Sequence, residues 1–198
     1  MNADRVSSRL SGDAAASLLD EIERLKGELA AAQATIAALE KRADVDPLLD
    51  ILNRRGFERA LKRALAYIGR YAATAALVYI DLDGFKAVND AHGHAAGDAL
   101  LKAVAGELVA HVRASDVVAR LGGDEFGVLM WNVAPSHALR RAREIEETVA
   151  RLSLLHHGVR LSVGASAGIA ELAPDLGAGG AIEAADRAMY ARKKERRG

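Results

Sequence analysis

The sequence contains no cysteine, carries no net charge and has no long apolar segment. Without cysteine it cannot form disulfides or bind a metal through thiolates. Lys and Arg together number 27, as do Asp and Glu, so the composition does not predict a surface for nucleic acid or another polyanion. No segment reaches the roughly 18 apolar residues of a membrane span, and the N-terminus lacks the apolar core of a secretory signal. These absences predict a soluble, cytoplasmic protein without a membrane span.

Its 198 residues are enough for one hydrophobic core with an appendage. We expect residues 1–12, which are small and polar, to be disordered. A domain boundary is expected at Asp-Val-Asp-Pro (44–47), because proline disfavours helical geometry in the residue before it. Strands and helices alternate through residues 44–198, which predicts an α/β or α+β domain with a central β-sheet flanked by helices.

Between residues 13 and 43, apolar residues recur at alternating spacings of four and three. They are Leu18, Ile22, Leu25, Leu29, Ala32, Ile36 and Leu39. This heptad pattern predicts a parallel coiled coil that joins two copies of the chain. In this register Glu21 and Lys26 are placed for an ion pair between the helices. The alternative is one amphipathic helix packed on its own domain, but the narrow stripe favours the coiled coil.

The rest of the chain predicts a series of alternating elements. Helices are expected at 53–65, 85–91, 98–112, 136–152 and 181–193, strands at 75–83, 116–119, 126–131 and within 159–170, and a glycine-rich loop at 177–180. Asn53 is placed to cap the first of these helices, and Pro135 to open the fourth.

Two groups of acidic residues are placed to meet at one end of the sheet. Asp81 and Asp83 end an apolar strand, and Gly-Gly-Asp-Glu (122–125) forms the tip of a predicted hairpin. Glycine allows close approach of a backbone to a phosphate. If the strands are neighbours, the carboxylates repel one another, and a hard divalent cation such as Mg²⁺ relieves that repulsion. On its own, however, the tip is better explained as a solvated turn, because Gly and Asp favour turns for conformational reasons alone.

Five ordered blocks resemble those of a GGDEF domain, the catalytic domain of diguanylate cyclases. They lie at 46–57, 80–90, 93–101, 120–126 and 185–190. The resemblance covers residues 44–197 and implies a palm-like nucleotidyl-cyclase fold. It further implies the condensation of two GTP into cyclic di-GMP, with release of two pyrophosphates. Each domain would bind one GTP with Mg²⁺, or alternatively Mn²⁺, so a homodimer is implied.

The resemblance also implies roles for single residues. Asp81, the carbonyl of Leu82 and Asp124 match the metal-binding positions. Glu125 matches a residue needed for activity, at the metal or at the attacking hydroxyl, and Lys86 is grouped with these catalytic residues.

Asn89 and Asp98 match the positions that recognise guanine. A carboxylate accepts hydrogen bonds from guanine N1–H and N2–H₂, a donor pair that adenine lacks. Further contacts with the triphosphate are implied for Phe85, Lys86, Gly122, Gly123, Lys193 and Arg197.

A second site is indicated upstream of the glycines. Arg113 and Asp116 match the RxxD motif through which cyclic di-GMP inhibits such enzymes. Without the neighbouring Gly-Gly-Asp-Glu signature, an ion pair at a helix end would be the better explanation; with it, the inhibitory site is favoured. Arg140, Arg141 and Arg143 are all candidates for completing the site.

Two other functions compete with an active cyclase. The chain could be a catalytically silent receptor that signals through Arg113 and Asp116, but its signature residues are intact. It could also be a palm enzyme with another substrate, although Asn89 and Asp98 favour guanine. The chain departs from the family at 48–51, and at Arg192 and Arg196 near its end. These departures concern signal coupling and packing of the last helix more than chemistry.

Overall fold

The computed structural model describes residues 18, 21–33, 35 and 43–195. The chain divides into two compact units, residues 1–43 and 44–198. Among the described residues, no helix has both the length and the hydrophobicity needed to cross a bilayer. Residues 1–12, and the heptad positions Ile36 and Leu39, lie outside the described residues.

The first unit contains a helix over residues 21–33. Its apolar heptad residues Leu18, Ile22, Leu25 and Leu29 are all exposed. Charged residues pair along the helix: Arg24 bonds Glu21, and Lys26 bonds Glu23. The other described residues of this helix are exposed as well, so the coiled coil and the ion pair between helices stay predictions.

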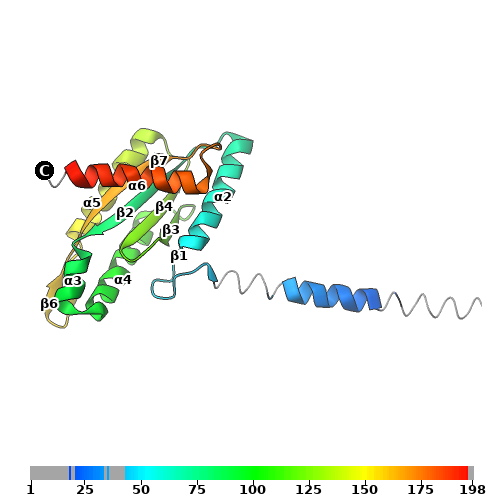
Figure 1. Cartoon of the computed structure of the whole chain (residues 1–198), viewed down its shortest axis with the longest axis horizontal. Coiled ribbons are helices and arrows are strands. Elements are labelled where there is room, and N and C mark those ends of the chain that lie inside the picture. The colour runs from blue at the N-terminus through cyan, green and yellow to red at the C-terminus, as the bar shows by residue number, and fades with distance from the viewer. Residues whose placement is uncertain (1–17, 19–20, 34, 36–42, 196–198) are drawn as a thin grey trace, which may run out of the picture. The chain divides into compact units, whose positions relative to one another are not determined.

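The second unit is built on a five-stranded sheet (Figure 1). In spatial order its strands are β1 (Leu52–Asn53), β3 (Val117–Arg120), β4 (Glu125–Trp131), β2 (Ala75–Asp83) and β7 (Gly164–Glu171). β1 runs parallel to β3, and the other neighbours are antiparallel. A separate two-stranded sheet pairs β5 (Leu154–His156) with β6 (Val159–Leu161).

Helices cover both faces of the larger sheet (Figure 1). α2 (Arg54–Tyr71) and α6 (Gly177–Glu195) pack on one face, and α3 (Phe85–His92), α4 (His94–His111) and α5 (Pro135–Arg151) on the other. β2 shows why both faces are filled. Val78 and Ile80 belong to one core cluster, while Leu77 and Tyr79 belong to the other, because successive side chains of a strand point to opposite faces.

α6 lies close against β7 because Gly168 has no side chain. A Cβ at this position would lie 2.0 Å from the backbone nitrogen of Met189 and 2.2 Å from the carbonyl oxygen of Ala185. Both atoms belong to the helix backbone and cannot turn away as a side chain can. Gly168 therefore sets the distance between the last helix and the sheet.

Most predicted elements are present, and several boundaries were wrong. Asn53 caps α2 as predicted, accepting a hydrogen bond from the Gly56 nitrogen, but the helix continues to Tyr71 because Ile68 extends its buried face. α4 begins at His94 rather than at residue 98. The predicted glycine loop at 177–180 is the first turn of α6, where burial of neighbouring alanines outweighs the low helix propensity of glycine. β5 was not predicted.

Candidate active site

The strands that carry the predicted acidic residues are neighbours in the sheet. Asp81, near the end of β2, lies opposite Glu125, the first residue of β4. The Leu82 nitrogen donates a 3.1 Å hydrogen bond to the carbonyl oxygen of Asp124. The sheet register therefore brings Asp81, Leu82, Asp124 and Glu125 to one end of the domain.

Lys193 of α6 lies between the two aspartates that end β2. Its ammonium bonds Oδ1 of Asp81 and lies 3.2 Å from Oδ1 of Asp83. Partial burial alone would lower the pKa of Lys193, but the bond to Asp81 and the negative charges of Asp81 and Asp83 outweigh burial and raise that pKa above its ordinary value. A pocket of about 280 Å³ adjoins this contact, lined by Asp81, Met189, Tyr190, Lys193 and Lys194.

Ser166 fixes Asp83 from the neighbouring strand. Its hydroxyl donates a 2.8 Å hydrogen bond to Asp83 Oδ2, and Ser166 itself is almost fully buried. Asp83 Oδ1 is buried too and makes no directed hydrogen bond with a described residue, so Lys193 balances its charge only through space. Nothing in the sequence marked Ser166 as a contact of Asp83, because the two residues are 83 positions apart.

The acid end of β2 suits a divalent cation that needs few protein ligands. Among the described residues, no three His, Asp or Glu side chains converge on one point. Two carboxylates and a backbone carbonyl are nevertheless enough for Mg²⁺, which takes its remaining ligands from water and substrate phosphates. Lys193 already places one positive charge between Asp81 and Asp83. The residues present therefore fit a cation with oxygen ligands.

Glu125 is held by residues to which sequence reasoning assigned no role. Burial, together with the nearby Glu125 carboxylate, raises the pKa of Tyr79, which places the Tyr79 hydroxyl beside Glu125. The Arg54 guanidinium lies 3.9 Å from a carboxylate oxygen of Glu125 and donates a 2.8 Å bond to the carbonyl of Leu121. Arg54 stands in one of the recognised sequence blocks, but only the fold shows that it touches the hairpin.

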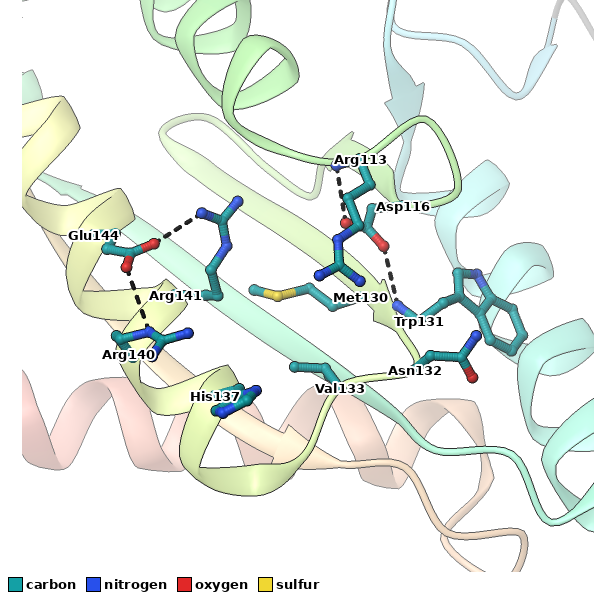
Figure 2. Close-up of a pocket in the computed structure, with 10 residues that line it drawn as sticks. All are labelled: Arg113, Asp116, Met130, Trp131, Asn132, Val133, His137, Arg140, Arg141 and Glu144. Carbon is teal, nitrogen blue, oxygen red and sulfur yellow. Dashed lines mark hydrogen bonds and ion pairs between the residues drawn. The ribbon is translucent and has the colours of Figure 1, made fainter.

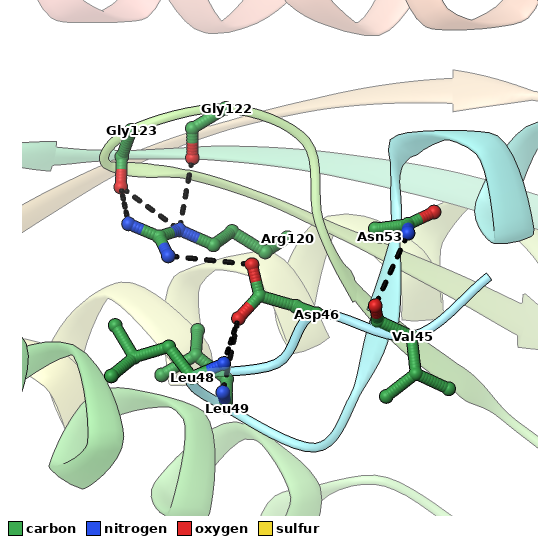
Figure 3. Close-up of polar contacts among 8 residues, drawn as sticks. All are labelled: Val45, Asp46, Leu48, Leu49, Asn53, Arg120, Gly122 and Gly123. Carbon is green, nitrogen blue, oxygen red and sulfur yellow. Dashed lines mark hydrogen bonds and ion pairs between the residues drawn. The ribbon is translucent and has the colours of Figure 1, made fainter. Parts of the chain in front are cut away.

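The glycine turn between β3 and β4 is fixed by Arg120 (Figure 3). Its guanidinium donates to the carbonyls of Gly122 and Gly123, at 3.2 and 2.7 Å, and lies 3.3 Å from Asp46 Oδ2. Asp46 in turn accepts from the Leu48 nitrogen at 2.9 Å. The N–H groups of both glycines have no hydrogen-bond partner among the described residues, so they are available to an anion.

The two predicted guanine-binding residues lie on consecutive helices, Asn89 on α3 and Asp98 on α4. Asn89 is half-buried in α3, and Asp98 is exposed in α4. A Cβ on Gly97 would lie 1.9 Å from Asn89 Oδ1, so the Asn89 side chain occupies the space beside that glycine. The lack of a side chain at Gly97 therefore allows the Asn89 amide of α3 to pack against α4, one residue before Asp98.

The remaining residues predicted to contact the triphosphate are Lys86, Phe85 and Arg197, and they differ in their surroundings. Lys86 is exposed in the first turn of α3, where it is free to reach a ligand. Phe85 begins the same helix, but its side chain is buried in the core, so only its backbone can face a phosphate. Both residues belong to α3, in agreement with the helix predicted over residues 85–91. Arg197 lies outside the described residues.

A second pocket surrounds Arg113 and Asp116 (Figure 2). It has a volume of about 290 Å³ and is lined by Arg113, Asp116, Met130, Trp131, Asn132, Val133, His137, Arg140, Arg141 and Glu144. Asp116 accepts from the backbone nitrogens of Arg113 and Trp131, both at 3.0 Å. The Arg113 guanidinium has no ion pair with a described residue, so the alternative of an Arg113–Asp116 ion pair is not what the structure shows.

Two of the three candidate arginines on α5 reach this pocket. Arg140 and Arg141 line it, and both contact Glu144, at 3.6 and 2.8 Å. Arg143 lines a different, smaller pocket beside β7 and α6. The wall of the second pocket thus carries Arg113, Arg140 and Arg141.

The family model and the similar proteins all point to diguanylate cyclases with a GGDEF domain. Residues 43–198 match the family model "Diguanylate cyclase, GGDEF domain". The chain is 42% identical over 161 residues to "Probable diguanylate cyclase DgcE" of Escherichia coli, covering 81% of this chain and 15% of that protein. It is 39% identical over 183 residues to diguanylate cyclase TpbB of Pseudomonas aeruginosa, covering 91% and 41%. The chain thus spans less than half the length of these two relatives.

A solved structure is similar over nearly the same region. The crystal structure of the coiled coil and GGDEF domain of DgcB from Caulobacter crescentus, in complex with c-di-GMP, has a TM-score of 0.75 and 27% sequence identity. The similarity covers 90% of this chain and 95% of that one. The chain with this sheet and this family match belongs to the GGDEF-domain diguanylate cyclase family.

Proposed function

We propose that the chain is a diguanylate cyclase, which condenses two GTP molecules into cyclic di-GMP and two pyrophosphates. The β2–β4 register carries this proposal most directly, since it brings Asp81 opposite Glu125 beside the anion-accessible glycine turn. The neighbouring Asn89 and Asp98 support guanine as the base, because they offer the acceptors and donor that its edge requires. The named relatives with the same domain support the same reaction.

Each of the two bonds formed has the same chemistry. The 3′ oxygen of one GTP bonds to the α-phosphorus of the other, the bond from that phosphorus to pyrophosphate breaks, and the hydroxyl loses its proton. We assign Lys86, Lys193 and the glycine N–H groups to the phosphates, where they counter developing negative charge. Glu125, which lies near Arg54 and Tyr79, is assigned to the reacting end, at the metal or at the hydroxyl.

Asp81, Asp124 and the Leu82 carbonyl are the residues we propose to hold Mg²⁺. A bound Mg²⁺ would supply charge neutralisation on the triphosphate and lower the pKa of an attacking hydroxyl. Lys193 would then leave Asp81 and Asp83 for the phosphates, because a divalent ion replaces its charge at the acids.

One domain offers sites for one GTP, so the reaction requires two domains facing each other. The exposed heptad residues of the first unit support a parallel coiled coil as the joint. Such a joint raises the local concentration of the second half-site without any new contact between the two domains. The DgcB structure, which contains a coiled coil with its GGDEF domain, supports the same arrangement.

We further propose that cyclic di-GMP inhibits the enzyme at the pocket of Arg113 and Asp116. The three arginines on its wall suit a phosphate, because a guanidinium donates two parallel bonds to such a group. Arg140 and Arg141 are the residues of α5 that we assign to this site.

The first experiment incubates the purified chain, stripped of bound nucleotide, with GTP and Mg²⁺. Chromatography should show cyclic di-GMP and pyrophosphate from the wild type and neither from Asp124→Ala. Arg113→Ala should make the same product but lose inhibition by added cyclic di-GMP.

A dimeric wild type that makes no product contradicts the cyclase. If that protein still binds cyclic di-GMP and Arg113→Ala does not, the alternative of a silent receptor is correct. Product formed equally well from ATP would instead contradict the roles of Asn89 and Asp98.

A further inference from the structure

Three aromatic side chains form a partly exposed surface beside the Arg113 pocket. We call Tyr67, Tyr71 and Trp131 the aromatic shelf. The Tyr67 ring lies 4.6 Å from that of Tyr71 and 5.7 Å from that of Trp131, the latter edge to face. The side chain of Tyr67 is 49% exposed and that of Tyr71 is 60% exposed, so neither ring is buried in a core. Two turns of α2 and the end of β4 thus present ring surface to solvent.

The aromatic shelf borders an open pocket of about 540 Å³. Its walls are Tyr67, Tyr71, Ala73, Ser115, Trp131 and Asn132. Trp131 and Asn132 also line the Arg113 pocket, so the two pockets adjoin at these residues. In Figure 2 both lie at the end of the Arg113 pocket away from Arg140 and Arg141.

The Arg113 pocket is small for the ligand assigned to it. Its volume of about 290 Å³ is at the lower limit of small-molecule sites, which range from roughly 300 to 1,000 Å³. Cyclic di-GMP has two guanine bases as well as two phosphates. The arginines can take a phosphate, but the second base needs further space, and the aromatic shelf borders the adjoining space.

We propose that the aromatic shelf stacks a guanine base of cyclic di-GMP whose phosphate is bound at Arg113. This inference rests on the proposed product site and adds a base-binding subsite to it. Aromatic rings attract nucleobases through their faces, and the shelf needs no rearrangement to offer them. Trp131 links the two parts of the site, because its backbone nitrogen bonds Asp116 while its ring belongs to the shelf.

The test is an isothermal calorimetric titration of the nucleotide-free full chain with cyclic di-GMP. Tyr71→Leu keeps apolar bulk but removes the ring, and should weaken binding by about fivefold or more. Tyr71→Phe keeps the ring and should bind as the wild type does. Trp131 is the only tryptophan in the sequence, so its fluorescence reports on the same site. Cyclic di-GMP should quench this fluorescence with the same midpoint concentration that calorimetry gives for binding.

The outcomes separate this inference from the proposed function. If Arg113→Ala abolishes binding but Tyr71→Leu and Tyr67→Leu bind with wild-type affinity, the aromatic shelf is not a base site, although the product site stands. If the wild type does not bind cyclic di-GMP at all, the product site fails and the inference fails with it. Circular dichroism of each variant shows that the fold is kept, as expected for exposed tyrosines.

Discussion

At the scale of single residues, Lys193 shows how the candidate active site is balanced without a metal. We predict that Lys193→Gln binds Mn²⁺ about tenfold more tightly than the wild type when no nucleotide is present. The substitution removes the positive charge that a cation must displace from Asp81 and Asp83. Electron paramagnetic resonance of free Mn²⁺ measures this affinity independently of turnover.

Lys194→Gln is the matched control for that measurement. Lys194 is exposed and its ammonium lies over the Tyr190 ring, 4.6 Å from its centre, rather than at the acids. Its Mn²⁺ affinity should stay within about twofold of the wild type. Equal affinities for all three proteins would mean that Lys193 does not compete with the metal.

The raised pKa values of Lys193 and Tyr79 predict loss of stability in alkaline solution. Both groups keep their protons in the folded protein at a pH where the unfolded chain loses them. Their contributions to the free energy of unfolding are therefore complete below the pKa values of the unfolded chain, near roughly 10 to 10.5. These contributions decline as the pH rises above those values. Urea unfolding should show that the free energy of unfolding declines between pH 8 and pH 11, and that this decline is smaller in Tyr79→Phe than in the wild type. An identical decline in that variant would exclude Tyr79 as a cause.

Residues of the site differ in how far the sequence could predict them. Asp81, Asp124 and Glu125 could be placed because they stand at strand ends within recognisable sequence blocks. Ser166 and Tyr79 could not, because each acts through a register that only the folded sheet defines. Their own residue types fit ordinary strand positions, so nothing local distinguishes them.

At the scale of elements, the contact of α6 with β7 should tolerate no side chain at Gly168. Gly168→Ala is expected to lower the free energy of unfolding by about 3 kcal/mol, because the new Cβ meets helix backbone at 2.0 Å. Gly106→Ala in α4 is the control, since no atom lies within 4 Å of its Cβ position. It should raise stability by roughly 0.5 kcal/mol. Chemical denaturation measures both, and a neutral Gly168→Ala would contradict the packing described.

A bidentate ion pair joins α6 to α5. Arg192 donates to both carboxylate oxygens of buried Glu146, at 2.7 and 2.6 Å, and the Ala167 nitrogen donates to the same carboxylate at 2.9 Å. The departure from the family at Arg192 therefore has a structural role. Glu146 was not singled out from the sequence, where it reads as one of several acids on an amphipathic helix.

We predict that Arg192→Ala costs about 2 kcal/mol of stability, because it leaves a buried carboxylate without its cation. Arg187→Ala on the same helix removes an exposed pair with Glu183 and should cost less than about 0.5 kcal/mol. Thermal unfolding of the two variants provides the comparison. Equal losses would show that burial of Glu146 does not matter.

The element boundaries that sequence reasoning missed share a cause. Glycines at 177–180 suggested a loop, but the helix there is stabilised by packing of Ala178 and Ala181 in the core. β5 is three residues long and pairs with β6 outside the main sheet, so no periodicity could reveal it. Tertiary contacts decided these segments, whereas the long apolar strand β2 was clear from its own residues.

At the scale of the whole molecule, the exposed heptad stripe predicts how activity depends on association. Leu25→Asp with Leu29→Asp should make the protein monomeric at micromolar concentration and reduce turnover per chain at least tenfold. Charges at buried seam positions disfavour the coiled coil, and the GGDEF domains then meet only by diffusion.

Analytical ultracentrifugation and a GTP assay over a range of protein concentrations test this together. Activity of the double variant should rise with concentration, and replacing residues 13–43 by an unrelated parallel dimeric coiled coil should restore it in part. Full activity of a demonstrated monomer would exclude the dimer as the catalytic unit.

The position of β7 beside β2 has a consequence for synthesis of the chain. β2 pairs with β4 on one side and β7 on the other, yet β7 follows it by some eighty residues. During translation, the first four strands can assemble while one side of β2 has no partner, and such an open edge invites pairing with another nascent chain. Ser166 and Lys193, which contact the acids at the end of β2, are likewise translated after that strand. A ribosome-bound intermediate that has only its first four strands therefore carries these acids without the lysine that balances their charge.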